Sequence, residues 1–393
     1  MLSCIVILCR ESSMPSHHTR LQSIDALRGL VMLFMLLDHV RETFFLHRQV
    51  SDPMDALSVE PSLFFTRLLS ALCAPVFIFL TGLSAWLYSQ KNNRRDTSRF
   101  LLKRGLFLVL LELTLVNLAW NGSLLGPTLW LQVIWCIGLC MIVLAGALHL
   151  PRAVLVGLGA LIVAGHNLLD PLVLTPDSPW FAPWAMLHQR EFIDLAGEVR
   201  ARTTYPVLPW IGVILLGWGA GPWFTHGTNP ARRAMLLTGW GVGLLLAFVA
   251  LRCLNGYGEQ PWVSTGDALR TLMSFLSARK YPPSLMFLLP TLGGCLLLLA
   301  VLERYQARRW VPLLALFGAA PMFFYLLHLY VLKALYLVAV ALWGLNQGDY
   351  FGFDHIGAVW LCSVLLAVLL YFPTRGFAAL KQQRRDIAWL KYF

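Results

Sequence analysis

The stretch from Ser23 to His47, SIDALRGLVMLFMLLDHVRETFFLH, is one apolar run with ionisable residues near both of its ends. It is long enough for a helix that crosses a membrane, because about 20 apolar residues span the bilayer hydrocarbon. With the helical period, a stripe roughly 80° wide contains Asp25, Arg28, Met32, Met35 and His39. The helical rise puts His39 about 21 Å along the axis from Asp25. Ionisable groups at such depths need a polar cavity or partners, so this helix predicts a functional site.

The composition indicates an integral membrane protein. Of the 393 residues, 58% are hydrophobic and only 13% are charged, whereas about a quarter of the residues in soluble domains are charged. The net charge of +11 comes from short basic runs between apolar stretches, without an aromatic-basic recognition module, so we expect no nucleic-acid partner. Most cysteines fall within apolar runs, and their spacing predicts no disulfide framework and no metal site.

We expect an all-α, polytopic membrane helix bundle of about ten transmembrane helices, with both termini in the cytoplasm. The ten apolar ranges are 24–46, 62–90, 99–120, 128–148, 152–168, 205–225, 230–253, 281–302, 312–343 and 355–374. The ninth is long enough to tilt or to break near Gly318 and Pro321. Basic residues gather in alternate connections, and the positive-inside rule places those connections in the cytoplasm.

The chain divides into three parts on this interpretation. Residues 1–20 form an N-terminal tail in which Met14 could be the true start, and no signal peptide is expected there. Residues 21–375 form a single transmembrane domain, since no repeat or linker divides them. Residues 376–393 form a basic cytoplasmic tail.

Two histidines near the end of the first helix are candidate catalytic groups. His39 is our first choice and His47 the second, because an imidazole can take a proton from an attacking hydroxyl or amine, or accept an acyl group itself. Asp38 and Glu42 would tune the site. Neighbouring helical side chains diverge by 100°, so another helix could supply the orienting partner of His39. The alternatives are a structural histidine between helices and an ordinary loop histidine.

Other polar residues complete the predicted site. Arg28 could bind a phosphate or carboxylate of a cytosolic cofactor, with Asp25 orienting its guanidinium; the alternative is an arginine that snorkels to the headgroups. The long segments 169–204 and 254–280 could hold a polar ligand over the membrane or lie on the lipid surface. We expect a shared cavity to be lined by Glu42, Tyr205, Lys280, Tyr281, Tyr325 and His328.

Six segments, in order, carry a family resemblance. They are SIDALRGLVMLFMLLDHVR, CAPVFIFLTGLSAWL, LELTLVN with LWLQVIWCIGL, YPVLPWIGVILLGWGAG, KYPPSLMFLLPTLG and MFFYLLHLY. Together they resemble a bacterial family of membrane proteins of unknown function. That family is similar to the catalytic domain of heparan-alpha-glucosaminide N-acetyltransferase, within the transmembrane acyltransferase superfamily. The likeness extends from Leu21 to about Tyr371.

The resemblance implies an N- or O-acetyltransferase-type enzyme with no tightly bound cofactor. Acetyl-CoA or another acyl-CoA from the cytosol would be the co-substrate, and the acceptor would be an extracytoplasmic carbohydrate or glycolipid amine or hydroxyl. The family's catalytic histidine follows a D-x-x-R-G motif, onto which both His39 and His47 map. The animal enzymes carry an asparagine in place of His39, so the choice stays open. We expect no luminal domain like that of the lysosomal enzyme, which argues against a heparan fragment as acceptor.

Two other functions fit a bundle with internal charges. A transporter or flippase would use the charged cluster as a substrate or proton pathway, although no repeat between halves is visible. A non-catalytic membrane scaffold would have no need of that cluster. The sequence contains no nucleophile elbow, phosphate-binding glycine loop or zincin helix, which disfavours a soluble-type hydrolase. The expected location is a bacterial inner membrane, crossed many times.

Overall fold

The computed structural model describes residues 22–48, 54–123, 126–195, 197–225, 227–384 and 386–393. It is 71% helical with few strands, so the predicted helix bundle is confirmed and a small sheet is added to it. The predicted N-terminal tail, with Met14, lies outside the described residues.

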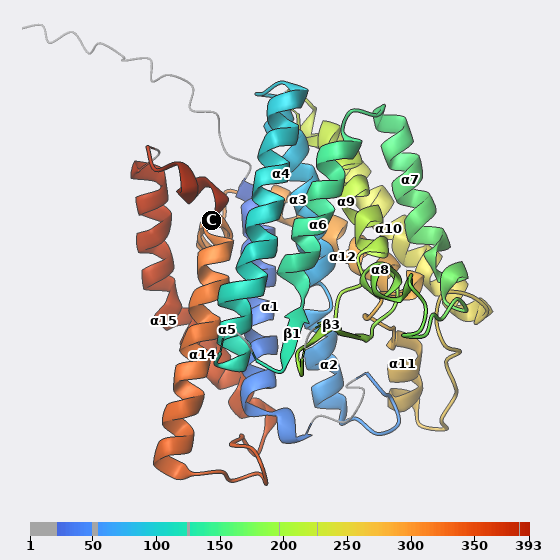
Figure 1. The fold of residues 1–393 in the computed structure, drawn as a ribbon. Coiled ribbons are helices and arrows are strands. Elements are labelled where there is room, and N and C mark those ends of the chain that lie inside the picture. The colour runs from blue at the N-terminus through green and yellow to red at the C-terminus, as the bar shows by residue number, and fades with distance from the viewer. Residues whose placement is uncertain (1–21, 49–53, 124–125, 196, 226, 385) are drawn as a thin grey trace, which may run out of the picture.

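Long helices run side by side between the two ends of the bundle, with shorter helices among them (Figure 1). Their bounds are α1 (Gln22–Phe44), α2 (Pro61–Ser70), α3 (Cys73–Ser89), α4 (Arg94–Leu111), α5 (Asn117–Asn121), α6 (Val133–Ala147), α7 (Arg152–Gly165), α9 (Leu208–Ala220), α10 (Pro230–Leu254), α12 (Leu285–Arg304), α13 (Trp310–Ala319), α14 (Pro321–Trp343) and α15 (Ile356–Gln383). The start of α1 and the C-terminus lie at the same end, which we call the Arg28 end (Figure 1).

Six of the described helical stretches are long and apolar enough to cross a membrane. They are Pro61–Ser89, Arg152–Leu169, Pro230–Leu254, Leu285–Arg304, Pro321–Trp343 and Ile356–Gln383. Shorter apolar helices lie at Val133–Ala147, Leu208–Phe224 and Trp310–Ala319. The protein is therefore a membrane protein, and the count of about ten spans stays a prediction.

Two helix boundaries bear on the predicted ranges. The expected break within 312–343 is confirmed, because α13 ends at Ala319 and α14 begins at Pro321. Proline lacks the backbone N–H that a continuous helix would need there. At the end of the chain, α15 continues past residue 375 to Gln383 and is followed by a short 3-10 helix, Ala388–Tyr392.

A small sheet and two short helices form much of the end opposite Arg28, which we call the loop end (Figure 1). Strand β1 (Thr128–Leu131) pairs in parallel with β3 (Arg200–Thr203), which pairs antiparallel with β2 (Phe192–Asp194). Helices α8 (Phe181–Leu187) and α11 (Ala268–Leu276) lie within the two long predicted connections. These connections are therefore folded parts of the molecule.

Glycines allow the helices around α1 to approach closely. A Cβ on Gly29 would overlap the backbone oxygen of Leu314 in α13, and a Cβ on Gly318 would overlap that of Asp25. Small residues of this kind permit backbone contact between membrane helices. The crossing fixes the first turns of α1, and with them Arg28, against α13.

Candidate active site

A cavity of about 1930 Å³ extends along α1 from the Arg28 end to the loop end. It exceeds the roughly 300–1,000 Å³ of common small-molecule pockets, so it has room for a large ligand or two substrates. The predicted stripe of α1 lies on its wall, together with neighbouring polar residues: Asp25, Arg28, Met32, Met35, Asp38, His39 and Glu42.

At one end of the cavity, Arg28 is held by direct hydrogen bonds. Its Nη1 donates to Asp25 Oδ1 at 2.8 Å, and its Nη2 donates to Ser84 Oγ on α3 at 3.0 Å. Four further basic side chains line this part of the wall: Lys91, Arg104, Arg233 and Lys381. Arg104 forms no hydrogen bond or ion pair with any described residue, so its guanidinium is available to an anionic ligand.

Near the middle of the cavity, His39 contacts a second histidine. His39 Nδ1 lies 2.7 Å from His328 Nε2, and His328 Nδ1 lies 2.6 Å from the backbone oxygen of Phe324. His328 is fully buried in α14. The rings of Trp120 and Tyr325 meet His39 edge-on, with centroids 5.4 and 6.0 Å away. The orientation of the His39 ring is thus fixed by α14 and by aromatic packing.

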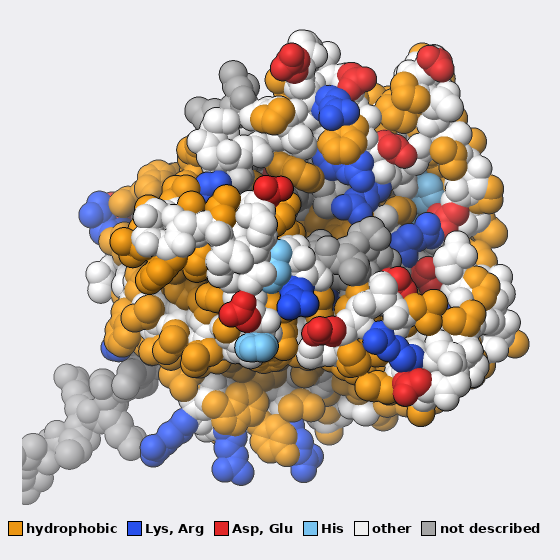
Figure 2. All heavy atoms as spheres, turned by 90° about the horizontal axis from the view of Figure 1, so that it is seen from below, with side chains coloured by type: hydrophobic (Ala, Val, Ile, Leu, Met, Phe, Trp, Pro, Cys, Tyr) orange, Lys and Arg blue, Asp and Glu red, His pale blue; other side chains and the backbone are white. Residues whose placement is uncertain are grey.

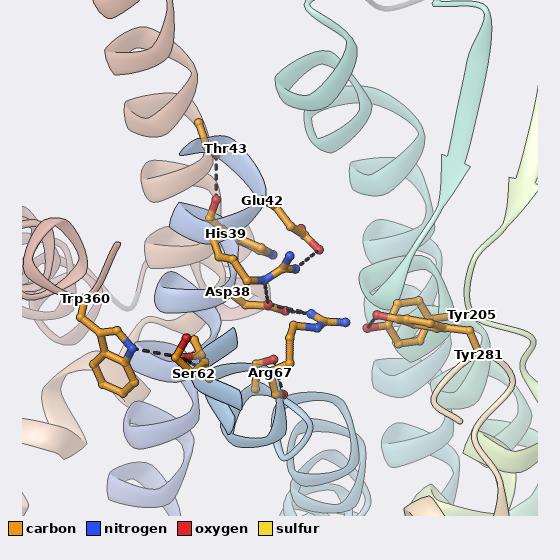
Figure 3. A network of polar contacts seen from close by, with 12 residues as sticks. Asp38, His39, Glu42, Thr43, Ser62, Arg67, Tyr205, Tyr281 and Trp360 are labelled. Carbon is orange, nitrogen blue, oxygen red and sulfur yellow. Dashed lines mark hydrogen bonds and ion pairs between the residues drawn. The ribbon is translucent and has the colours of Figure 1, made fainter. Parts of the chain in front are cut away.

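Beside this pair is a network of charges around Asp38 (Figure 3). Both carboxylate oxygens of Asp38 accept from Arg67 Nη1 at 2.7 Å, and Oδ1 accepts from Arg41 Nε at 3.0 Å. Arg41 Nη2 also donates to Glu42 at 3.0 Å. Arg41 and Arg67 are only 1% and 7% exposed, so Asp38 compensates two buried cations. Asp38 is committed to these arginines, and His328 supplies the partner of His39.

Aromatic and basic side chains meet at the loop end of the cavity. The hydroxyls of Tyr205 and Tyr281 lie 3.4 Å apart, and the Arg67 guanidinium points toward this pair (Figure 3). Lys280 Nζ lies 5.1 and 5.9 Å from the Tyr281 and Tyr205 ring centroids, and the Arg190 guanidinium carbon lies 4.9 Å from the Tyr281 centroid. These are cation–π distances. Seen from this end, the surface is hollowed near its middle, with Lys and Arg side chains around the hollow (Figure 2).

One acidic residue ties the two long connections together. Asp170 Oδ1 accepts from His188 Nε2 at 3.0 Å, and its Oδ2 accepts from Arg279 Nη2 at 2.5 Å. Although partial burial by itself raises the pKa of Asp170, the hydrogen bonds from His188 and Arg279 hold that pKa below its ordinary value. The contact with Arg279 fixes the residue next to Lys280.

The family model for the catalytic domain of heparan-alpha-glucosaminide N-acetyltransferase matches residues 20–257, more than half of the chain. The chain belongs to this family. It is a family of membrane acyltransferases, so the protein is a transferase of acetyltransferase-like type. No curated protein matches the chain significantly.

The match divides the site of this family member in two. The matched part contains α1 with Arg28 and His39, α2 with Arg67, and Tyr205. Four predicted site residues lie beyond the matched range: Lys280, Tyr281, Tyr325 and His328. The fold brings both groups to one cavity or its wall, although they are far apart in the sequence.

The two candidate histidines have different surroundings. His39 lines the cavity, whereas His47 is absent from its wall. His47 lies against the Phe45 ring, at a centroid distance of 5.3 Å, and beside Gly352 of a distant connection. Of the residues expected to line the cavity, Glu42, Tyr205, Lys280, Tyr281 and Tyr325 do so. His328 is placed differently from that expectation, because its buried ring lies behind His39.

The residues of the site that were not singled out from the sequence include Arg67, Ser84, Trp120 and Arg190. Arg67 gave a usable signal, because a charged residue within the apolar range 62–90 needs a partner. Ser84, Trp120 and Arg190 gave no such signal in the sequence, since serine and tryptophan are common in membrane helices and Arg190 lies in a mixed polar connection. Among the described residues, no group of three or more His, Cys, Asp or Glu is arranged to hold a metal ion.

Proposed function

We propose that this protein transfers an acyl group, typically acetyl, from a cytosolic acyl-CoA to a sugar amine or hydroxyl on the other side of a bacterial inner membrane. The observation that carries the proposal is the single cavity that is lined by Arg28 at one end, His39 in its middle and Lys280 at the other end. Family membership supplies the reaction class.

We place the acyl-CoA at the Arg28 end. Its phosphates match the basic side chains there, since guanidinium and ammonium groups bind phosphate oxygens by charge-assisted hydrogen bonds. Arg28 is held in place by Asp25 and Ser84, and Arg104 has no described partner of its own. The acyl thioester would then extend along the α1 stripe toward His39.

The acceptor would enter from the loop end, where Tyr205, Tyr281 and Lys280 present hydroxyl, ring and ammonium groups. In direct transfer, His39 takes the proton of the acceptor hydroxyl or amine as that group attacks the thioester carbonyl. The C–S bond breaks, and the proton passes from His39 to the CoA thiolate, which leaves as free CoA. In the alternative, His39 attacks first, releases CoA and carries the acyl group to the acceptor.

The topology belongs to the same proposal. About ten spans with both termini in the cytoplasm would put the Arg28 end on the cytosolic side. Two observations support this arrangement: the start of α1 and the C-terminus lie at one end of the bundle (Figure 1), and Lys91, Arg104 and Lys381 line the cavity at that end.

The test is label transfer by the purified, detergent-solubilised protein. Given radiolabelled acetyl-CoA and a panel of cell-envelope sugars and glycolipids, it should transfer label and release one CoA per acetyl group. His39→Ala should abolish transfer, and His47→Ala is the matched control that should retain it. Full transfer by His39→Ala would refute the role of His39, and no CoA consumption with any acceptor would refute the function.

A transporter is the second candidate, because the same cavity is lined by residues from both ends of the bundle and is flanked by buried charges. Uptake of a polar solute into proteoliposomes without CoA consumption would favour it. Consumption of acetyl-CoA without entry of the solute into the proteoliposomes would favour the transferase.

A further inference from the structure

The contact between His39 and His328 determines where the protons of both rings lie. A backbone carbonyl oxygen can only accept, so the 2.6 Å contact from His328 Nδ1 to the Phe324 oxygen requires a hydrogen on His328 Nδ1. A neutral imidazole has one N–H, so His328 Nε2 then carries a lone pair. The 2.7 Å contact with His39 Nδ1 therefore requires His39 Nδ1–H to donate.

The neutral state of His328 follows from its surroundings. Its ring is fully buried, and among the described residues its hydrogen-bonding contacts are the Phe324 oxygen and His39 alone. Of the carboxylates near His39, Asp38 is bonded to Arg41 and Arg67, and Glu42 is bonded to Arg41. A buried imidazolium without a carboxylate would be strongly disfavoured.

The remaining nitrogen of the pair is His39 Nε2. With Nδ1 protonated, neutral His39 has its lone pair on Nε2, and no described group forms a hydrogen bond with that atom. His39 lines the cavity. The free lone pair thus belongs to the histidine that meets the cavity.

We infer that His328 is a positioning residue: together with the Phe324 carbonyl it holds His39 in the Nδ1–H form and leaves Nε2 as the atom that receives the acceptor's proton or the acyl group. The inference rests on the proposed function for its catalytic consequence, but the proton arrangement itself can be measured without turnover. When His39 Nε2 gains a proton, His39 Nδ1–H keeps donating to His328, so His328 stays neutral throughout.

The experiment compares two substitutions of His328 in the full-length protein. His328→Gln keeps an oxygen that can accept from His39 and an amide that can donate to Phe324, whereas His328→Leu removes both. We expect His328→Leu to lower kcat about 100-fold with the KM for acetyl-CoA unchanged, on the scale of general-base catalysis, and His328→Gln to stay within about 10-fold of wild type. Leu332→Ala, one turn further along α14, controls for lost packing in the same helix.

The second readout is nitrogen NMR of histidine-labelled protein, with the His39 signals assigned by their loss in His39→Ala. We expect His39 as the Nδ1–H tautomer in wild type and in His328→Gln, and a tautomer mixture in His328→Leu. An Nε2–H tautomer in wild type would overturn the inference even if a variant failed to fold. Wild-type kcat in His328→Leu, with His39→Ala inactive, would overturn it while leaving the proposed function intact; full transfer by His39→Ala would instead refute the role of His39.

Discussion

The two ends of the cavity hold their positive charges in different ways. At the Arg28 end, the cation is bonded to side chains of two packed helices, and the Gly29–Gly318 crossing fixes the backbone beneath it. At the loop end, Lys280 and Arg190 come from connecting segments and lie over tyrosine rings. The first end is built on rigid helices, whereas the second depends on contacts between segments such as Asp170 with Arg279.

This difference fits a division of labour between the ends. A rigid site suits a ligand that is the same in every reaction, and binding residues on segments between helices can vary without disturbing the bundle. We therefore assign the common acyl donor to the Arg28 end and the specific acceptor to the loop end, with His39 between them. The following predictions test that comparison, from the largest effect to the smallest.

The largest effect should come from His39, which serves both ends in the proposed mechanism. His39→Ala should lower kcat by about 10³-fold or more, because general-base and covalent roles contribute on that scale, while the KM values for both substrates change little. Steady-state kinetics with each substrate varied in turn measures this. A loss confined to one KM would assign His39 to one end and contradict its central role.

The Asp38 network should respond mainly in stability. Asp38→Asn leaves Arg41 and Arg67 without their shared carboxylate and should cost about 3–5 kcal/mol of folding free energy, seen as a lower midpoint of thermal unfolding in detergent. Glu42→Gln is the control, because the Glu42 side chain is 32% exposed and, among the described residues, forms an ion pair with Arg41 alone; it should cost about 1 kcal/mol or less. Equal midpoints for the two variants would contradict the account.

Two variants, one at each end of the cavity, should each affect the KM of a different substrate. Arg28→Ala should raise the KM for acetyl-CoA about 10-fold and leave the acceptor KM unchanged, because a charge-assisted contact to phosphate contributes about 1.5–3 kcal/mol. Lys280→Ala should raise only the acceptor KM. If both variants raised the KM of the same substrate, the proposed difference between the ends would be wrong.

The smallest effect should come from the contact between the two long segments. Asp170→Asn should lower the local stability of 169–204 and 254–280 by about 1 kcal/mol or less, since this ion pair is partly exposed. Limited proteolysis within these two segments should therefore be faster at neutral pH. Because the folded pKa of Asp170 is lowered, its contribution is present above the unfolded pKa of about 3.9 and is lost as pH falls through the folded value. Unchanged cleavage at neutral pH would show that Arg279 is positioned by other contacts.

Much of the bundle could be predicted, because apolar length and helical period are local properties. They placed a helix at α1, its polar stripe on one face and the break before Pro321. The arginine of another helix that pairs with Asp38 lies on α2, and the histidine that contacts His39 lies on α14. No local pattern in the sequence specifies which distant helices pack together. The sheet was missed because its strands have three or four residues, too few for a visible alternation.

The most direct test of the central claim is a sided assay in sealed proteoliposomes. Radiolabelled acetyl-CoA is supplied only at the face with the Arg28 end and a sugar acceptor only at the other face, with orientation fixed by protease accessibility. We predict acetylated acceptor on the far side and an equal amount of free CoA on the near side, both lost in His39→Ala. Product that forms only when both substrates share one side would contradict the account.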